Sequence, residues 1–319
     1  MKPLPRILLA TALASLAAAG GSPQSGAAGM SACGASARAA FQSCKLETQS
    51  AARLALGRCN NLADPGARKA CQQQASTEAK DQQASCREQN GLRRGVCGRL
   101  GAAPYVPVID PANFTHSTTI DNPYFPLIPG TTFISEGQTE DGFEHDEFAV
   151  TSTTRTILGV TCVEVHDARK VGGAVLEDTR DWFAQDDDGN VWYFGENTTI
   201  VEGGVALVDG GLPVDLSGTW TGGVGGAQPG IVMEAHPVVG DFYRQEFLLG
   251  EAEDLAEVKS LSEPVTVPYG SFTTCLMTEE SSPLSPGDVE SKFYAAGKGL
   301  LLTIESTGER VELVDITPH

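Results

Sequence analysis

The sequence predicts an α+β protein with segregated regions: an N-terminal disulfide-clamped antiparallel helical hairpin, then a duplicated antiparallel β-meander in the form of an open barrel or a sandwich. Six of the eight cysteines are placed as mirror images about Pro65, as expected for two helices joined by a turn. Residues 31–97 are rich in Ala, Gln, Arg and Lys and show no strand-like alternation. After residue 122, short runs of β-branched and aromatic residues are separated by Gly, Asp and Pro.

Residues 1–20 have the order of a secretory signal peptide. Lys2 and Arg6 precede an apolar run from residue 7 to residue 19, and small residues follow from Gly20. The run is shorter than the roughly 20 apolar residues that a transmembrane helix needs, and no later stretch of the sequence reaches that length. We therefore expect a secreted, periplasmic or cell-envelope protein without a transmembrane segment.

The cysteines of residues 31–97 predict a covalently closed hairpin. An even number of cysteines behind an export signal indicates an oxidising compartment. Residues equally distant from the turn of an antiparallel hairpin lie side by side, and Asp64-Pro65-Gly66 supplies the turn. A thiolate site for copper or zinc is the alternative, but no two of these cysteines are closely spaced. The predicted disulfides of the hairpin are Cys33–Cys97, Cys44–Cys86 and Cys59–Cys71.

The charge of the chain is unevenly divided. Residues 33–97 contain ten Lys and Arg against five Asp and Glu, whereas residues 104–319 contain nine against 36. So acidic a surface argues against nucleic acid as a partner, because phosphates require clustered cations. The composition fits solubility outside the cell, cationic partners or loosely held divalent ions, and no cofactor is expected.

The remainder of the chain reads as a linker and a β domain. Residues 98–112 are rich in Gly, Pro and Ala and predict the linker, and residues 113–319 predict the β domain. A weak internal repeat with an offset of about 110 residues divides this domain into copies over residues 122–198 and 232–315. Cys162 and Cys275 take equivalent places in the two copies, each shortly after a glycine turn. A pseudo-twofold packing of the copies would bring them together, so we predict a fourth disulfide, Cys162–Cys275.

Three segments of the β region resemble a known kind of protein. They are NPYFPLIPG at residues 122–130, VTVPYGSF at residues 265–272 and KFYAAGKGLLL at residues 292–302. They look like uncharacterised secreted bacterial β-domain proteins, whose pattern is related to the open barrels of periplasmic lipoprotein carriers. The resemblance implies a curved antiparallel sheet with an apolar concavity, and it carries over no catalytic residue.

Metal ligands are the candidate site residues of the sequence. His145 and Asp146 are adjacent, and His166 is followed by Asp167, so adjacent strands could bring both pairs to one metal ion. Charged residues on exposed strands and at hairpin tips are more often solvated. Residues 186–190 (DDDGN) resemble a calcium loop but lack its glycine and glutamate positions, and a tight turn explains them better. Clustered acids could also act as glycosidase carboxylates, which only their separation can decide.

Three functions remain open on this basis. The first is a secreted, non-enzymatic protein that binds an apolar or amphiphilic ligand in the curved sheet. The second is a metal-dependent hydrolase that uses the neighbourhood of His145 and His166. The third is a structural or adhesive protein of the cell envelope. No Gly-x-Ser-x-Gly elbow and no free cysteine is expected, so a nucleophile is missing and the non-enzymatic class is preferred.

Overall fold

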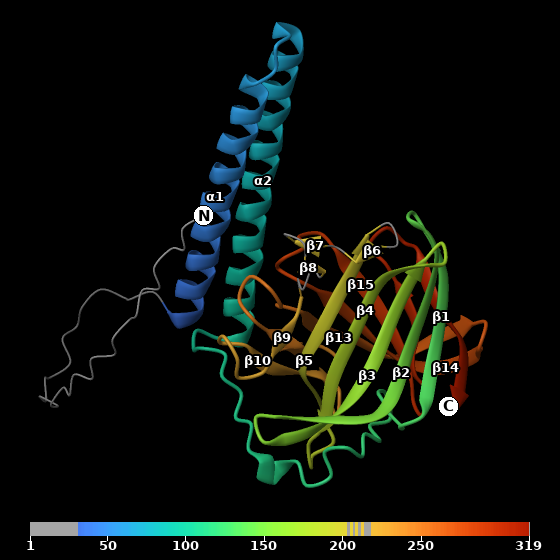
Figure 1. Cartoon of the computed structure of the whole chain (residues 1–319). Helices are drawn as coiled ribbons and strands as arrows, with labels where there is room; N and C mark the ends of the chain where they lie inside the picture. Colours follow the sequence, from blue (N-terminus) through green and yellow to red (C-terminus); the bar gives the residue numbers. More distant parts are fainter. Residues whose placement is uncertain (1–30, 203–204, 207, 210–211, 214–217, 319) are drawn as a thin grey trace, which may run out of the picture. The chain divides into compact units, whose positions relative to one another are not determined.

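The computed structural model describes residues 31–318 except 203–204, 207, 210–211 and 214–217 (Figure 1). The predicted signal peptide lies outside the described residues. Ser31–His319 form one compact unit. Two long helices come first and an antiparallel sheet follows, as the sequence predicts. None of the described helices has an apolar stretch long enough to cross a membrane.

The hairpin consists of α1 (Ala32–Asn60) and α2 (Pro65–Leu100). The hydroxyl of Ser31 accepts a hydrogen bond from the backbone N–H of Gly34 at the start of α1, 3.1 Å away. Asp64 caps α2 in the same way, since its Oδ1 accepts from the N–H of Ala67 at 2.6 Å, and Pro65 follows at the first helical position. The turn signal of the sequence therefore acts as the start signal of α2.

All three nested disulfides of the hairpin are present, as predicted: Cys33–Cys97, Cys44–Cys86 and Cys59–Cys71. Few large apolar side chains are buried between the helices. Ala37, Ala75 and Val96 are buried, whereas Leu46 and Leu54 are 65% and 58% exposed. The cross-links therefore replace much of the apolar packing that holds most helical pairs together.

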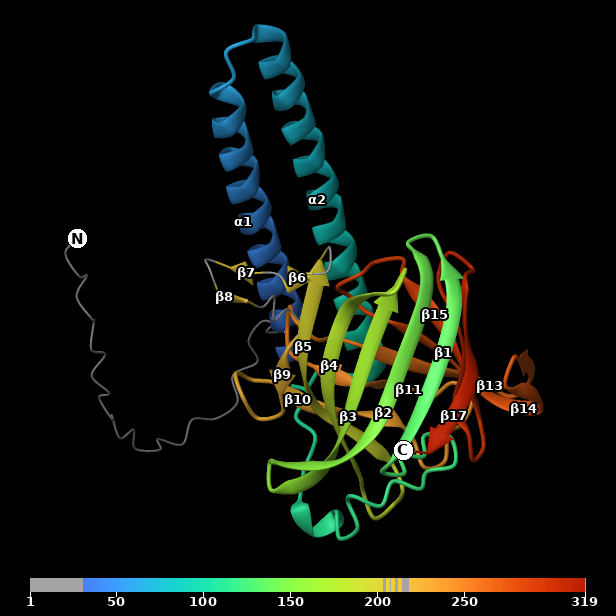
Figure 2. The ribbon, with the colours of Figure 1, turned by 45° about the vertical axis from the view of Figure 1, so that its right-hand side comes forward.

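The β region is an antiparallel sheet of 15 strands within the described residues, plus the two-stranded pair β7–β8. Its strand order is β11-β13-β14-β15-β16-β17-β1-β2-β3-β4-β5-β10-β12, and β6 and β9 also pair with β5. Figure 2 shows β1 and β17 side by side, where the last strand joins the first. The bounds are β1 Thr131–Thr139, β2 Gly142–Ile157, β3 Val160–Val171, β4 Ala174–Gln185, β5 Val191–Glu202, β6 Val205–Ala206, β7 Val208–Asp209, β8 Leu212–Pro213, β9 Trp220–Thr221, β10 Gln228–Met233, β11 Phe242–Arg244, β12 Glu246–Phe247, β13 Leu255–Val267, β14 Gly270–Ser281, β15 Val289–Ala295, β16 Gly299–Ile304 and β17 Arg310–Pro318. A short 3-10 helix, η1 (Pro111–Asn113), precedes them.

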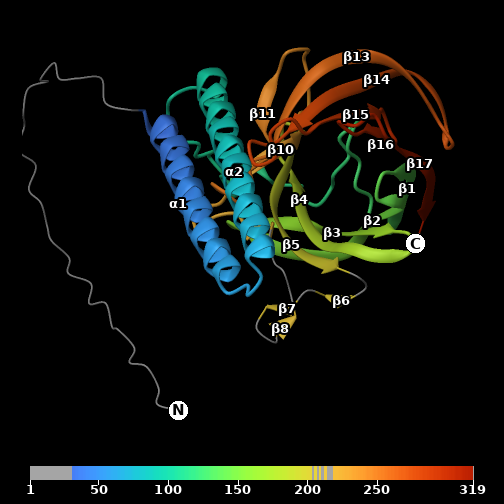
Figure 3. The same ribbon diagram turned by 90° about the horizontal axis from the view of Figure 1, so that it is seen from above.

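The strand order of the sheet contains two runs of strands in sequence order, which we call passes. The first pass contains β1 to β5 and β10, and the second contains β11 and β13 to β17, so each pass supplies six strands in sequence order. This order fits the repeat that the sequence suggests, and the duplication itself stays a prediction. Seen from above, the strands curve around a common interior (Figure 3).

The two ends of the strand order meet in one short segment, residues 242–247, which we call the seam. Phe242–Arg244 pairs with β13 at one end of the sheet, and Glu246–Phe247 pairs with β10 at the other. The sheet is not closed by a full strand, because β11 and β12 follow one another along the chain instead of pairing. The ladders of the seam are short, with three residue pairs on one side and two on the other.

The predicted Cys162–Cys275 disulfide is wrong: both thiols are free and buried. Cys162 packs in a cluster with Phe114 and Trp182, whereas Cys275 belongs to another cluster with Phe293. The strand order explains the difference, because the two passes continue one another around a single sheet, and β3 and β14 are separated by five strands. Equivalent places in the two passes therefore need not approach one another.

Candidate ligand cavity

The curved sheet encloses a cavity of about 700 Å³, a size typical of small-molecule sites. Strands of both passes line it, together with the segment that precedes β1 and the seam. Its carboxylate residues are Glu144, Asp146, Asp167, Glu177, Asp181, Glu196, Glu246, Asp254, Glu280, Asp288, Glu290 and Glu305. Its cationic residues are Arg169 and Lys292. Its aromatic residues are Phe125, Phe133, Phe148, Phe183, Tyr193 and Tyr294.

Strand alternation explains which side chains reach the cavity. Side chains two positions apart in a strand point to the same face, so Asp146 and Phe148 of β2 both face inward. Asp181 and Phe183 repeat the arrangement on β4. Each of these strands therefore presents an acidic residue and an aromatic residue to the interior, one beyond the other.

The aromatic residues form a continuous strip, the aromatic layer, made of Phe125, Phe133, Phe148, Phe183 and Tyr193. The ring centroids of Phe133 and Phe148 are 6.3 Å apart, and those of Phe148 and Phe183 are also 6.3 Å apart. Phe183 stacks on Tyr193 at 4.8 Å, and Phe125 meets Phe183 edge-on at 5.5 Å. These rings give the cavity an apolar, aromatic wall.

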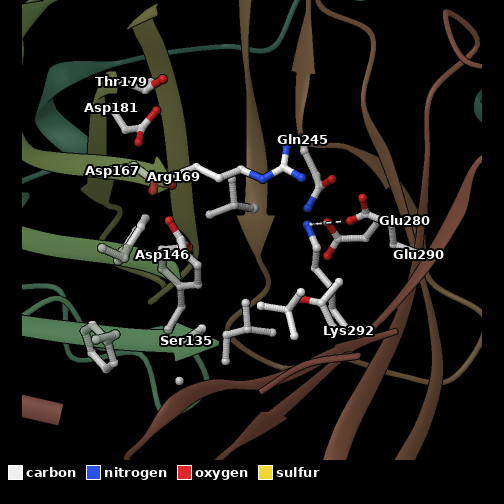
Figure 4. Close-up of a pocket in the computed structure, with 18 of the residues that line it drawn as sticks. Ser135, Asp146, Asp167, Arg169, Thr179, Asp181, Gln245, Glu280, Glu290 and Lys292 are labelled. Carbon is white, nitrogen blue, oxygen red and sulfur yellow. Dashed lines mark hydrogen bonds and ion pairs between the residues drawn. The ribbon is translucent and has the colours of Figure 1, made fainter. Parts of the chain in front are cut away.

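Beside it lies the acidic layer, made of Asp146, Asp167, Asp181 and Glu196. Figure 4 shows Asp146, Asp167 and Asp181 on the same side of the cavity. The Tyr193 hydroxyl donates a hydrogen bond of 2.6 Å to Oδ1 of Asp181. Oδ1 of Asp146 is buried without a hydrogen-bond partner among the described residues.

Burial raises the pKa of every carboxyl group in the acidic layer. The pKa of Asp181 lies well above its usual range because of burial, and the neighbouring acids add to the shift. Burial and the charge of Asp146 do the same for Asp167, and burial raises the pKa of Asp146 itself. Burial raises the pKa of Glu196 to about 7. The layer is therefore poised to take up protons or a cation.

On the opposite wall of the cavity, the carboxylates are paired with a cationic residue of the protein itself. Lys292 Nζ lies 2.9 Å from Oε2 of Glu280 and 3.3 Å from Oε2 of Glu290. Figure 4 shows these three residues on one side of the cavity. The Tyr294 hydroxyl and the Thr278 hydroxyl donate to Oε1 of Glu280, each at 3.0 Å. Burial acts to raise the pKa of Glu280, but Lys292 and these hydrogen bonds outweigh it and lower the pKa.

Arg169, the second cationic residue of the cavity, is also paired with a carboxylate. Arg169 donates to Oε2 of Glu144 through Nε at 2.9 Å and through Nη2 at 2.7 Å. Twelve carboxylate residues thus face two cationic side chains, each already paired with a carboxylate. The interior is amphiphilic, with a strong acidic excess, rather than the apolar concavity that the resemblance implied.

The structure separates the residues that the sequence suggested as metal ligands. His145 Nδ1 lies 2.9 Å from Oε1 of Glu136, and its Nε2 lies 3.0 Å from Oε1 of Glu147. His166 Nε2 lies 3.1 Å from Oδ1 of Asp178.

The register accounts for this separation. Lys170 lies opposite His145, whereas His166 lies opposite Ala149, so about 13 Å of strand separates the two histidines. Asp146, the neighbour of His145, points into the cavity on the other face. Within the described residues, no group of three or more His, Cys, Asp and Glu side chains is arranged to hold a metal ion.

Residues 186–190 form a tight turn, as expected. Oδ1 of Asp186 accepts from the N–H groups of Asp188 and Asn190, and its Oδ2 accepts from Nε1 of Trp192 at 2.8 Å. Gly189 has a φ of 94°, which favours glycine. The carboxylate of Asp186 therefore shapes the connection between β4 and β5.

The acidic and aromatic layers are not among the sequence predictions, although the sequence contains a signal for them. Asp146-Glu147-Phe148 and Asp181-Trp182-Phe183 share an Asp-x-Phe spacing, which places both end residues on one strand face. Lys292-Phe293-Tyr294 of β15 has the same spacing of a charged and an aromatic residue, and it also presents its end residues to the cavity. An alternation of charged and aromatic residues thus marks an amphiphilic interior.

Comparison with known proteins does not assign the chain to a family. No family model matches it, and no curated protein matches it. A solved structure of a candidate lipoprotein from Parabacteroides distasonis ATCC 8503 is similar at 14% identity, covering 61% of this chain and 98% of that chain, with a TM-score of 0.32. At that level the similarity supports neither a fold nor a function, so the functional argument depends on the cavity.

Proposed function

We propose that the protein is a secreted or cell-envelope binding protein whose cavity takes an amphiphilic organic cation, with the apolar part on the aromatic layer and the charged group at the acidic layer. The observation that carries this proposal is the juxtaposition of the two layers on the same strands, inside a cavity of about 700 Å³. The three disulfides support export, since such cross-links persist in oxidising compartments.

The charge of the cavity favours a cation over other ligands. An anion would find no unpaired cation in the cavity, since Arg169 and Lys292 are each paired with a carboxylate. A neutral, wholly apolar ligand would remove water from the acid groups of the acidic layer and return no hydrogen bond. A cation supplies the missing opposite charge, and the unpartnered Oδ1 of Asp146 is an oxygen that the positive charge can approach.

The aromatic layer adds a second source of affinity. Apolar surface that leaves water contributes about 25 cal/mol per Å². An organic ammonium group near an aromatic face gains about 0.5–2 kcal/mol more, depending on how far it is desolvated. Phe183 and Tyr193 adjoin Asp181, so one ligand can use the rings and the carboxylate together.

Three probes with the same ten-carbon chain test the proposal: decyltrimethylammonium, decyl maltoside and decyl sulfate, each used below its micellar concentration. We expect titration calorimetry to show the ammonium probe binding at least about tenfold more tightly than the other two, a difference of about 1.4 kcal/mol. Equal affinities for the three, or no binding of the ammonium probe, would contradict the proposal.

A pair of substitutions on one strand locates the site. Asp181→Asn removes an ionisable group of the acidic layer, whereas Asp178→Asn changes the opposite face of β4, where Asp178 contacts His166. We expect the first variant to lose about tenfold in affinity for decyltrimethylammonium and the second to keep wild-type affinity. Identical losses in the two variants would place the ligand outside the cavity.

A further inference from the structure

We propose that Arg93 of helix α2 is a positioning residue for the cavity: it fixes the carboxylates of the wall at the seam and thereby increases affinity for the cationic ligand. The inference rests on the proposed function for its ligand, and on the contacts of α2 for its mechanism.

Arg93 and Glu253 form a buried bidentate ion pair between the hairpin and the β region. Arg93 Nε lies 3.0 and 2.9 Å from the two carboxylate oxygens of Glu253, and Nη2 lies 2.7 Å from Oε1. Arg93 is 5% exposed and Glu253 is 1% exposed. Oε1 of Glu253 also accepts from the backbone N–H of Gly250 at 2.8 Å. The pair therefore orders the turn between β12 and β13.

The residue after Glu253 faces the cavity. Asp254 lines it, and the backbone oxygen of Asp254 accepts a hydrogen bond of 2.8 Å from the N–H of Gln245 in the seam. Gln245 and Glu246 line the same wall. The Arg93–Glu253 ion pair lies on one side of the backbone at residues 253–254. It thus sets the position of three polar side chains on the other side, those of Gln245, Glu246 and Asp254.

A second contact of α2 reaches the same region. Gln89, one helical turn before Arg93, donates through Nε2 to the backbone oxygen of Leu284 at 3.1 Å. Leu284 lies in the connection between β14 and β15, and Ser285 and Asp288 of that connection line a smaller cavity of about 180 Å³. Asp254 and Lys292 line both cavities, so the two are adjacent.

The seam is the place where the wall most needs such support, because short ladders hold it. Arg99, at the end of α2, adds an outer contact: its guanidinium lies 3.6 Å from the ring centroid of Phe242, and Nη1 donates to Glu257 at 2.6 Å. The Arg99–Glu257 pair is largely exposed and contributes little. Buried ion pairs seldom increase stability over apolar contacts, and their best attested role is to fix one arrangement. The buried Arg93–Glu253 pair fits that role.

The test compares Arg93→Gln with Arg99→Gln in the full chain. Glu253 keeps a cationic neighbour in the first variant, because the charge of Arg244 also acts on it, so we expect the variant to fold. We expect hydrogen exchange over residues 245–256 to accelerate in Arg93→Gln, and affinity for decyltrimethylammonium to fall about tenfold. Arg99→Gln should leave both near wild type, and Arg93→Lys should restore part of the affinity.

The two measurements separate the possible failures. If wild type binds the probe and Arg93→Gln binds it equally with unchanged exchange, the positioning role is refuted and the proposed function stands. If wild type does not bind the probe, the proposed function fails, while the exchange comparison still decides whether Arg93 orders the wall. If Arg93→Gln does not fold, Glu253→Gln carries the same comparison, because it removes the charge of the pair and keeps an oxygen that can accept from Arg93 and Gly250. Wild-type exchange in that variant with unchanged affinity refutes the role.

Discussion

The middle disulfide of the hairpin offers a quantitative test of how the hairpin is stabilised. With Cys59–Cys71 closed, the Cys44–Cys86 bridge encloses a further 15 residues on each helix. A loop of about 30 residues gives about 3.6 kcal/mol on the chain-entropy model at 298 K. The same model gives about 2.8 kcal/mol for the inner bridge and about 3.4 for the outer one, which adds 11 residues on each helix. Without the middle bridge, its loop and that of the outer bridge merge into one of about 52 residues, which gives about 4.1 kcal/mol in place of about 3.6 and 3.4. Little apolar burial exists to offset the loss, so we expect Cys44→Ala/Cys86→Ala to destabilise the hairpin by about 2.9 kcal/mol.

Two spectroscopic signals separate the hairpin from the sheet. Apart from the short helix η1, α1 and α2 are the helices of the described chain, so circular dichroism at 222 nm follows the hairpin. The three tryptophans all lie in the β region, so their fluorescence follows the sheet. With a slope of about 1 kcal/mol per molar urea, the helical midpoint should fall by about 3 M. A matched control, Ser43→Ala/Arg87→Ala, changes neighbouring residues and should keep the wild-type midpoint. A helical midpoint within about 0.5 M of wild type in the cysteine variant would refute the account of the hairpin as a cross-linked structure.

The remaining predictions concern charges and thiols. Binding of decyltrimethylammonium near pH 7 should release protons, because a cation lowers the raised pKa of the acidic layer; calorimetry in buffers of different ionisation enthalpy measures this, and a buffer-independent heat would contradict it. Burial raises the pKa of Glu196 to about 7 from its usual 4.5, so its contribution to stability is complete below pH 4.5 and is lost as the pH rises through 7. Urea midpoints that rise between pH 4.5 and pH 7 in wild type relative to Glu196→Gln would oppose the assignment. Lys292→Met should destabilise the protein by about 2 kcal/mol at pH 7, less than the loss of a fully buried ion pair, because Lys292 is partly exposed. The loss of stability should be smaller in acid, where Glu280 becomes protonated. A loss of stability that does not depend on pH would show that packing, not charge, is responsible. Cys162 and Cys275 should react with a thiol reagent after denaturation without reductant and not in the native protein, since both are buried and burial raises the pKa of Cys162 to about 12; native reactivity or no thiols on denaturation would contradict this.

The hairpin could be predicted in detail from the sequence because local rules determine it. The mirror spacing of Cys33 to Cys97 depends only on helical rise and a turn, and Asp64-Pro65 marks that turn. The antiparallel sheet followed from alternation and turn residues in the same way. Both features are set by residues close together in sequence or by one symmetric pairing.

The sequence predictions that proved wrong depend on how strands far apart in the sequence are ordered in the sheet. Equivalent cysteines would meet across a twofold axis, but two passes that continue one another around a sheet keep Cys162 and Cys275 apart. Asp146 was singled out for its neighbour His145, whereas strand alternation sends the two side chains to opposite faces. The Arg93–Glu253 contact joins residues 160 positions apart, and no local pattern marks it.

The docking of α2 through Arg93 gives the order of maturation a physical consequence. A newly made chain whose cysteines are still reduced lacks the cross-links of the hairpin, so we expect α2 to be less ordered and the Arg93–Glu253 pair to be incomplete. The sheet can form its ladders at that stage, but its weakest stretch remains unsupported. We therefore expect binding of decyltrimethylammonium to appear only after the thiols of the hairpin are oxidised.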